Sequence, residues 1–174
     1  DFTTGADTIN ISLTTTAANT YSFTNKGTAA NASDSIAKLS SVKGEYIYNT
    51  TTNQIVLDTD GNGLLQAGDL AITLTGTSAL NDADVKFAIT TVAGGLSTVT
   101  TGDGQDLITS LHAGDIMTTG KGNDLITLGE DAIQTGNIDM GAGTDTLQMK
   151  HANSGLNASA TVAGVTNILI DEAK

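Results

Sequence analysis

The chain has 174 residues, enough for one sizeable domain or two small ones. Its 7 Lys and Arg against 19 Asp and Glu give a net charge of -12 without any basic cluster. This balance argues against a nucleic-acid-binding surface and against attraction to an anionic membrane. The absence of Cys excludes disulfides and thiolate metal sites, and no apolar run approaches the roughly 20 residues of a membrane span.

The predicted elements are mostly short strands, rich in Thr, Ile and Val and separated by Gly, Asn and Asp, which indicates an all-β fold. In chain order, the expected strands are 7–13, 45–49, 54–58, 70–76, 85–90 and 166–170. Two segments favour a helix: 33–41, which has a Ser/Asp cap, and more weakly 78–84. A boundary near residue 95 divides a β-rich region, 1–95, from a Gly-rich region, 96–174. The alternative is one continuous unit with a shared core.

A nine-residue repeat carries the strongest functional signal in the sequence. Each copy has Asp at position six and a large apolar residue at position eight. The copies are "TGDGQDLIT" (101–109), "SLHAGDIMT" (110–118), "TGKGNDLIT" (119–127) and, after an interval, "MGAGTDTLQ" (140–148). This is the G-G-x-G-x-D-x-U-x pattern of calcium-binding parallel β-helices, where U is large and apolar. It predicts a parallel β-roll in which Ile108, Met117, Ile126 and Leu147 point inward.

The nine-residue spacing has a physical reason. Six residues make a tight turn and three a short strand, so two repeats complete one coil and residues 18 apart stack about 4.8 Å from each other. Asp106 and Asp124 then lie on one side, and their carboxylates repel unless a cation lies between them. Turn glycines allow positive φ and aim carbonyl oxygens at the cation, and such an all-oxygen shell favours Ca²⁺. These glycines are Gly102, Gly104, Gly120, Gly122, Gly141 and Gly143.

Two departures from the repeat limit the number of expected ions. The copy "SLHAGD" lacks both turn glycines, so Asp115, on the opposite side, is expected to be a poorer ligand. Residues 128–139 are interpreted as a degenerate rung with a three-residue bulge, which brings Asp145 back beneath Asp124. We therefore expect one or two ions on the side of Asp106, Asp124 and Asp145, and none opposite. The alternative is a Gly- and Asp-rich run of ordinary turns.

A second candidate calcium site lies in "DTDGNGLLQAGD" (58–69), which matches D-x-[DN]-x-[DN]-G with an acid at position twelve. Strand-like segments flank it, so we expect an EF-like calcium loop between two strands instead of a helix–loop–helix. The alternative is an Asx-rich hairpin turn without an ion. The expected ligands are side-chain oxygens of Asp58, Asp60, Asn62 and Asp69, the carbonyl of Leu64, and Gln66 through a water.

Three stretches carry a resemblance to a known family. Residues 101–150 resemble the RTX β-roll of type-I-secreted bacterial S-layer and surface proteins. "TVAGVTNILI" (161–170) is similar to the "GIE-x-L-x-(I/V)" strand that often follows such rolls. "GEYIYNTTTNQIVLDTDGNGLLQAGDLAITLTG" (44–76) resembles the family's "Y-x-Y-N-x-x-T-x-x-L-x-x-D-x-D-G-x-G" segment. The resemblance implies calcium binding, export as an unfolded chain and an extracellular or cell-surface location.

No catalytic constellation emerges from the sequence, and we expect no enzyme. The histidines are His112 and His151, and neither H-E-x-x-H nor G-x-S-x-G occurs. Two classes of function remain. The favoured one is a calcium-dependent structural module of a secreted cell-surface protein, S-layer or adhesin-like. The other is a calcium-binding accessory domain of an extracellular enzyme whose catalytic part lies outside this sequence.

Position seven of the repeat suggests a contact surface. It is apolar at Leu107, Ile116 and Leu125, and Thr146 breaks the series. Leu107 and Leu125 are 18 apart and are expected to be neighbours on the outer face of the roll. The favoured interpretation is that residues 1–95 cover them. A neighbouring copy of the chain, or another surface-layer component, is the second possibility, and two scattered surface leucines are the third.

Overall fold

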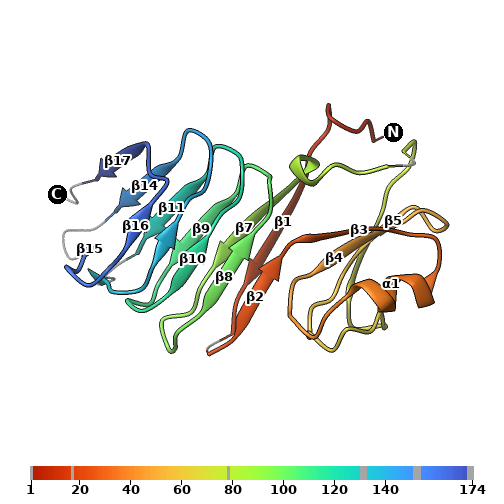
Figure 1. Cartoon of the computed structure of the whole chain (residues 1–174), viewed down its shortest axis with the longest axis horizontal. Helices are drawn as coiled ribbons and strands as arrows, with labels where there is room; N and C mark the ends of the chain where they lie inside the picture. The colour runs from red at the N-terminus through yellow and green to blue at the C-terminus, as the bar shows by residue number, and fades with distance from the viewer. Residues whose placement is uncertain (1, 17, 78, 130–132, 151–153, 172–174) are drawn as a thin grey trace.

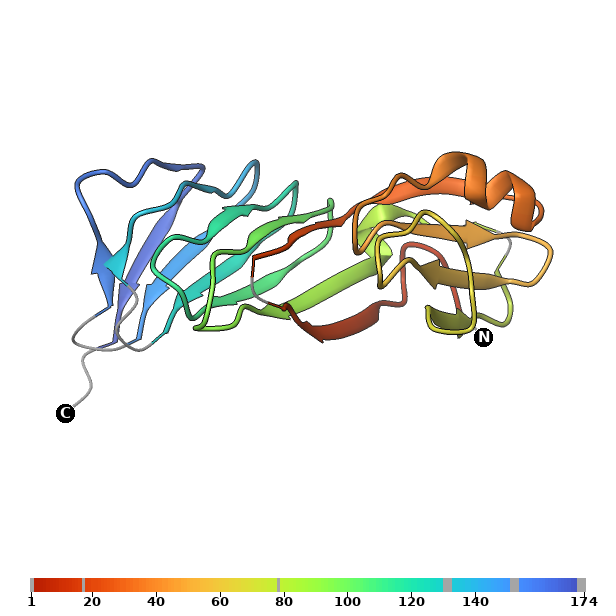
Figure 2. The same cartoon turned by 90° about the horizontal axis from the view of Figure 1, so that it is seen from below.

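The computed structural model describes residues 2–16, 18–77, 79–129, 133–150 and 154–171. Two parallel sheets face each other along most of the molecule, and a four-stranded sheet lies at one end (Figures 1 and 2). The described helices are α1 (Ala32–Lys38) and the 3-10 turn η1 (Asp82–Asp84). In this part of the chain, no helix has the length and apolar character needed to cross a membrane. The all-β expectation is confirmed.

The chain winds as a parallel β-solenoid, passing alternately from one sheet to the other. The six-stranded sheet holds, in spatial order, β1 (Ile9–Thr14), β7 (Val85–Thr90), β9 (Leu107–Ser110), β11 (Leu125–Leu128), β14 (Thr146–Met149) and β17 (Asn167–Ile170). The five-stranded sheet holds β16 (Val162–Ala163), β13 (Ile138–Asp139), β10 (Ile116–Thr118), β8 (Thr98–Thr101) and β2 (Thr20–Phe23). A small parallel pair joins β12 (Ile133–Gln134) to β15 (Gly155–Leu156). This solenoid is compatible with the predicted β-roll.

The strand register confirms the stacking that the repeat predicts. Leu125 pairs with Leu107, 18 residues away, whereas on its other side Leu125 pairs with Thr146, 21 residues away. The three additional residues fall between Gly129, which stacks on Ser110, and Gly136, which stacks on Asp115. The bulge expected within 128–139 is therefore confirmed, although residues 130–132 lie outside the described part of the chain.

Position eight of each repeat forms the core of the solenoid. Ile108, Met117, Ile126 and Leu147 are each 0% exposed, as the apolar periodicity predicts. Ile126 stacks between Ile108 and Leu147 in one sheet, while Met117 occupies the equivalent place in the other. Two facing sheets of such short strands can bury little apolar surface per coil, so the stack of coils is the stable unit.

Residues 25–84 interrupt the solenoid between β2 and β7 and build the four-stranded sheet. Its strands are β3 (Asn25–Ala29), β4 (Tyr46–Asn49), β5 (Gln54–Leu57) and β6 (Leu70–Thr73). β3 is parallel to β4, and β4, β5 and β6 are antiparallel neighbours. Helix α1 lies on β3 and β4, which confirms the helix expected at 33–41.

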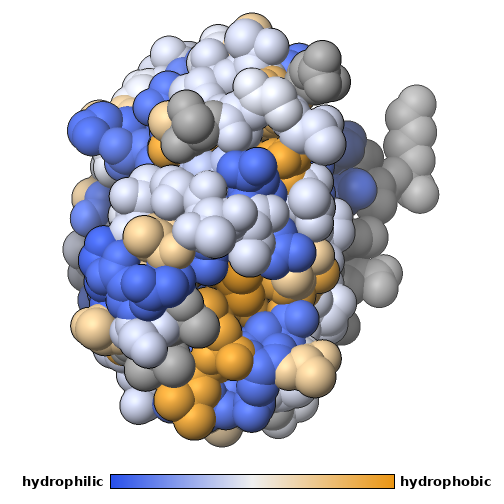
Figure 3. Space-filling view, turned by 90° about the vertical axis from the view of Figure 1, so that its right-hand side faces the viewer, coloured by the Kyte–Doolittle hydropathy of each residue, from blue (hydrophilic) through white to orange (hydrophobic). Residues whose placement is uncertain are grey.

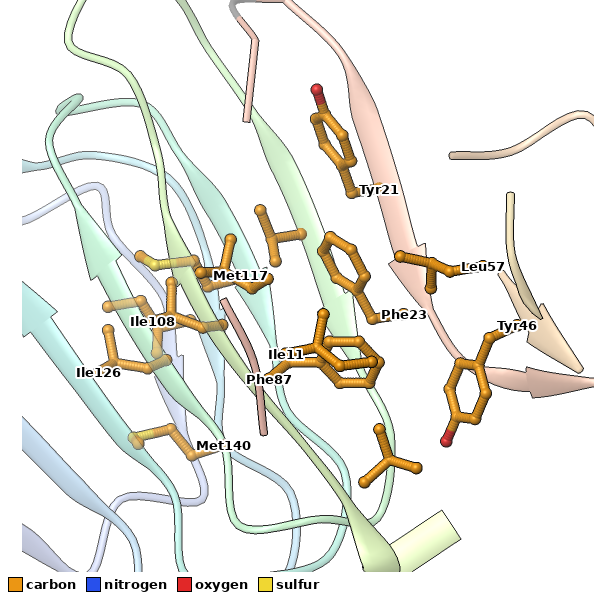
Figure 4. Packing of buried hydrophobic residues seen from close by; sticks show 14 of the residues in the cluster. Ile11, Tyr21, Phe23, Tyr46, Leu57, Phe87, Ile108, Met117, Ile126 and Met140 are labelled. Atoms are coloured by element: carbon orange, nitrogen blue, oxygen red, sulfur yellow. The ribbon is translucent and has the colours of Figure 1, made fainter. Parts of the chain in front are cut away.

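Aromatic rings join this sheet to the first coils of the solenoid (Figure 4). The ring centroids of Phe23 and Phe87 lie 4.9 Å apart, and those of Tyr46 and Phe87 lie 5.6 Å apart. All three side chains belong to one hydrophobic cluster that continues into the solenoid core through Ile108 and Ile126. Residues 1–95 and 96–174 thus share a core, and the strands β1, β2 and β7 extend the solenoid sheets on the N-terminal side of residue 95.

The two ends of the molecule differ in how they meet solvent. The end that carries the four-stranded sheet shows a mostly hydrophilic surface with an apolar strip (Figure 3). At the other end, β17 pairs with β14 on one side only within the described chain, and Ile168 and Ile170 are 60% and 66% exposed. Ile168 continues the column of Ile126 and Leu147, so the solenoid core reaches the surface at this end.

The outer leucines are not covered as the sequence analysis favours. Leu107 is 38% exposed, and Leu125 is half-buried. β7 and β1 lie beside Leu107 in the same sheet, in the order β1-β7-β9, and not over it. The expectation that residues 1–95 cover Leu107 is therefore wrong, because the N-terminal strands extend the sheet at its edge.

Candidate calcium sites

Three aspartates of the repeat stack in one column, at the edge where the chain passes from the five-stranded to the six-stranded sheet. The Oδ1 atom of each accepts a hydrogen bond from a backbone N–H of the preceding coil. Phe87 N donates to Asp106 at 2.7 Å, Asp106 N to Asp124 at 2.8 Å, and Asp124 N to Asp145 at 2.9 Å. The predicted grouping of Asp106, Asp124 and Asp145 is what the structure shows, and each carboxylate is held in a fixed orientation.

The turn glycines allow these coils to approach closely. A Cβ atom at Gly122 would lie 2.0 Å from the carbonyl oxygen of Gly104, and one at Gly143 would lie 1.5 Å from that of Gly122. Gly120 and Gly141 meet the carbonyl oxygens of Gly102 and Gly120 in the same way. Any side chain at these positions would push the turns apart, so the glycines keep the carboxylates at strand separation.

The second oxygen of each stacked carboxylate has no protein partner. The Oδ2 atoms of Asp106, Asp124 and Asp145 are buried and make no hydrogen bond within the described part of the chain. Burial raises the pKa of Asp106 to about 6, against hydrogen bonds that lower it, and the charge of Asp124 adds to the rise. Burial likewise raises the pKa of Asp124, with a contribution from Asp145. Ionised carboxylates in this column therefore carry an uncompensated desolvation penalty.

The column fits a hard divalent cation. Buried carboxylate oxygens without donors, next to backbone carbonyls of closely stacked turns, are the oxygen donors that Ca²⁺ prefers. Bound Ca²⁺ would supply the positive charge that this buried column lacks. Asp106, Asp124 and Asp145 are the residues that would hold it, and the six turn glycines would bring carbonyl oxygens into reach.

The raised pKa values predict how the calcium-free protein responds to pH. A carboxyl whose pKa is higher in the folded than in the unfolded state binds its proton more tightly when folded. For Asp106, the contribution of this proton to the free energy of unfolding is fully present below the unfolded-state pKa near 3.8. It is lost as the pH rises through the folded-state pKa of about 6. In chelator, Asp106 alone should lower the free energy of unfolding by about 1 kcal/mol between pH 5 and pH 7.5.

Urea unfolding at several pH values in chelator measures this slope. Asp106→Asn is the matched variant, because the amide oxygen can still accept the bond from Phe87 N but the group no longer titrates. The variant should lose the downward slope in this window. An identical slope in wild type and variant would show that Asp106 does not titrate there.

Asp115 lies at the opposite edge of the solenoid, where protein groups bond both of its oxygens. Oδ1 accepts from Ser97 N at 2.9 Å. Oδ2 accepts from the hydroxyls of Ser110, at 2.9 Å, and of Thr91. Asp115 is 0% exposed and does not reach either of the two candidate sites. These donors satisfy both oxygens of Asp115 from within the protein, and its being the poorer ligand stays a prediction.

The second predicted cluster also forms. The loop 58–69 connects the antiparallel strands β5 and β6, so the expected position between two strands is confirmed. Carboxylate oxygens of Asp58, Asp60 and Asp69 all lie within 4.8 Å of one another. Gly61 N and Gly63 N donate to the two oxygens of Asp58 at 2.7 and 2.8 Å, and Gly63 has a φ of +73°.

Other contacts within this loop order the remaining candidate ligands. Asp60 Oδ2 accepts from the side-chain amides of Asn62 and Gln66, at 2.8 and 2.7 Å. Asp69 accepts from Thr59 N at 3.0 Å and from Gln66 N at 2.9 Å. Burial raises the pKa of Asp58, and the nearby Asp69 adds to the rise. Three carboxylates so close together repel one another, and a cation among them would remove that repulsion.

Comparison of the chain with protein-family models, with curated proteins and with solved structures finds no match.

Three further residues lie around the column and were not expected as ligands. The hydroxyl groups of Thr101 and Thr119 lie beside Asp106 and Asp124 and lower the pKa of these carboxyls. Asp82, in η1, lies next to Gly102 although its own turn lacks the repeat. Thr101 and Thr119 are 18 residues apart, at position one of two repeats, although no role was expected for them. Asp82 lies outside the repeat, so only the folded chain brings it to the column. Of the histidines, His112 is 4.0 Å from Asp115, and His151 lies outside the described residues.

Proposed function

We propose that this chain is a calcium-dependent structural module of a secreted bacterial cell-surface protein, of the S-layer or adhesin type, that folds and assembles when it binds Ca²⁺. The observation that supports this most directly is the column of Asp106, Asp124 and Asp145. Each of these buried carboxylates has one oxygen without a partner in the described chain. The proposal assigns the chain no catalytic role.

The architecture agrees with this function. A parallel solenoid with acidic turns at one edge is compatible with an RTX β-roll, and the loop 58–69 offers a second cluster of carboxylates. The stack of coils presents the outer faces of a six-stranded and a five-stranded sheet. Under this proposal, exposed apolar side chains such as Leu107 and Ile116 on those faces, and Ile168 at the end of the solenoid, are available for contacts with surface-layer components or further copies.

Fractionation of cells that produce the full-length protein tests the proposal. An antibody raised against this chain should detect the protein in the cell-surface fraction in medium with millimolar Ca²⁺. Washing with a chelator should release it or render it sensitive to protease. A mutant in which Asp106, Asp124 and Asp145 are all replaced by Asn should be lost from the surface at every calcium concentration.

The same experiment separates the alternative function. A soluble hydrolytic activity in the medium that copurifies with the antibody signal would identify an accessory domain of an extracellular enzyme. A protein that stays on the surface, protease-resistant, in chelator would contradict calcium-dependent folding in either role.

A further inference from the structure

The first turn of the aspartate column differs from the turns that follow it, because a carboxylate takes the place of a backbone carbonyl. A Cβ atom at Gly120 would meet the carbonyl oxygen of Gly102 at 2.3 Å, and one at Gly141 would meet that of Gly120 at 2.0 Å. At Gly102 the nearest atom is instead Oδ2 of Asp82, at 2.7 Å. The side chain of Asp82 therefore enters the position that a carbonyl occupies in the later coils.

Further oxygens without partners lie around this turn. The hydroxyl of Thr101, the neighbour of Gly102, is buried and lies beside the carboxyl of Asp106, whose pKa it lowers, but no hydrogen bond of normal geometry joins it to Oδ2 of Asp106. Thr101 is 3% exposed and Asp106 is 2% exposed. Asp82 and Asp106 flank this turn, since Oδ2 of Asp82 lies at Gly102 and Asp106 ends the same repeat turn.

We propose that Asp82, Asp106 and Thr101 form a divalent-cation site, for Ca²⁺, between η1 and the first repeat turn. This inference rests on the proposed calcium-binding function and adds residues outside the repeat. A water molecule would satisfy the Thr101 hydroxyl, but it would not neutralise the buried carboxylate of Asp106 or the half-buried carboxylate of Asp82. A hard cation neutralises them and accepts the hydroxyl oxygen as a further ligand. The pKa of Lys121 is raised by its bond to Asp103, at 2.6 Å, and further by Asp82, but this ammonium is exposed and makes no bond to the buried oxygens of Thr101 and Asp106.

An ion here would tie the four-stranded sheet to the solenoid. The hydroxyl of Tyr46, in β4, donates to Oδ1 of Asp82, while the backbone N of Asp103 donates to Oδ2 at 3.2 Å. The ring of Tyr46 lies at the edge of the aromatic cluster that joins the two parts (Figure 4). The carboxylate that binds the ion is thus held from both sides of the junction.

Calcium counting on the whole chain tests the site. Equilibrium dialysis and titration calorimetry with CaCl₂ give the number of bound ions and their affinities. Asp82→Asn should bind one ion fewer than wild type, or bind that ion at least about tenfold more weakly, since calcium affinity follows the charge of the ligands. Asp34→Asn, on helix α1, is the matched control with the same change of charge and should bind as wild type does.

Thr101→Val is a second test of the ion site that does not depend on whether Asp82→Asn folds. Valine has nearly the shape of threonine but lacks the unpartnered hydroxyl. At an ion site, the replacement weakens the affinity for one Ca²⁺, whereas without an ion it leaves calcium binding unchanged. Suppose that the wild type binds Ca²⁺ and that the Asp82→Asn or Thr101→Val protein binds the same number of ions with the same affinity. This result overturns the site at Asp82 but leaves the proposed function standing. Wild type that binds no Ca²⁺ overturns the proposed function as well.

Discussion

In chelator, the chain is expected to be only marginally stable, with less ordered strand content and a much lower melting temperature, and millimolar Ca²⁺ should restore both in one cooperative transition. The apo state must bury the stacked carboxylates of Asp106, Asp124 and Asp145 with an unpartnered oxygen on each, at a net charge of -12. An ion present at one hundred times its dissociation constant contributes about 2.7 kcal/mol to the free energy of unfolding. Two or three ions then contribute about 5–8 kcal/mol, comparable with the whole stability of a typical domain.

Far-ultraviolet circular dichroism and thermal melting, in chelator and in 10 mM Ca²⁺, measure the change. Mg²⁺ at equal ionic strength is the control for screening, because it is smaller, prefers octahedral geometry and keeps its water ligands. It should restore little of the signal. The same strand content and melting temperature in chelator as in Ca²⁺ would show that protein contacts alone stabilise the solenoid.

Such a switch would suit the proposed export route. Extracellular calcium modules typically bind with dissociation constants of about 10⁻⁴–10⁻³ M, far above the free calcium concentration of a cytosol. Binding free energy then becomes folding free energy only outside the cell. The chain contains no Pro and no Cys, so neither slow prolyl isomerisation nor disulfide formation would delay folding after export.

The solenoid could be predicted from the sequence only where the nine-residue repeat has its characteristic Gly and Asp residues. Position eight identified the buried column of Ile108, Ile126 and Leu147, because a three-residue strand offers one inward position for each coil. The spacing of 18 identified Leu107 and Leu125 as neighbours for the same reason.

The first coil could not be found in this way. Gly5 and Asp7 precede β1 but belong to no nine-residue repeat, and β1 pairs with β7 while β2 pairs with β8 in parallel. The long insertion 25–84 separates the partners, and alternation of Ile with polar residues predicts a strand but not the strand it pairs with. In the next coil, Phe87 of β7 occupies the ladder position that Asp holds in later coils, since its backbone N donates to Asp106.

The candidate sites at the two edges of the solenoid could likewise be predicted only in part from the sequence. The sequence identified the carboxylates and their stacking, because each Asp falls at a fixed place in its repeat. It did not identify the donors to Asp115, because Thr91, Ser97 and Ser110 are common residues outside any motif. Whether a buried carboxylate would need an ion depends on these donors, and they are visible only in the folded chain.

In the described part of the chain, protein donors bond both oxygens of Asp115 at one edge but only one oxygen of Asp124 at the other. Substitutions of these two residues are therefore expected to differ strongly in their effect on calcium-induced stability. Asp124→Ala should remove a greater part of the calcium-induced increase in stability than Asp115→Ala. Asp124 is the middle member of its column, bonded to Asp106 N and donating its own N–H to Asp145. Its loss can weaken ions bound on the side of Asp106 and on the side of Asp145. We therefore expect the calcium-induced increase in the free energy of unfolding to fall by about 3–5 kcal/mol. Urea unfolding with and without Ca²⁺, at pH 7.5, gives the increase for each variant.

Asp115→Ala should instead destabilise the protein equally in Ca²⁺ and in chelator. It leaves Ser97 N and the hydroxyl of Thr91 buried without an acceptor, at a cost of about 1–3 kcal/mol each before relaxation, whereas the hydroxyl of Ser110 can still donate to the carbonyl of His112 at 3.2 Å. Asn variants sharpen the contrast. Because burial raises the pKa of Asp124, Asp124→Asn should be at least as stable as wild type in chelator and less stable in Ca²⁺. Equal losses of the calcium-induced increase at positions 124 and 115 would show that the ions do not select this edge of the solenoid.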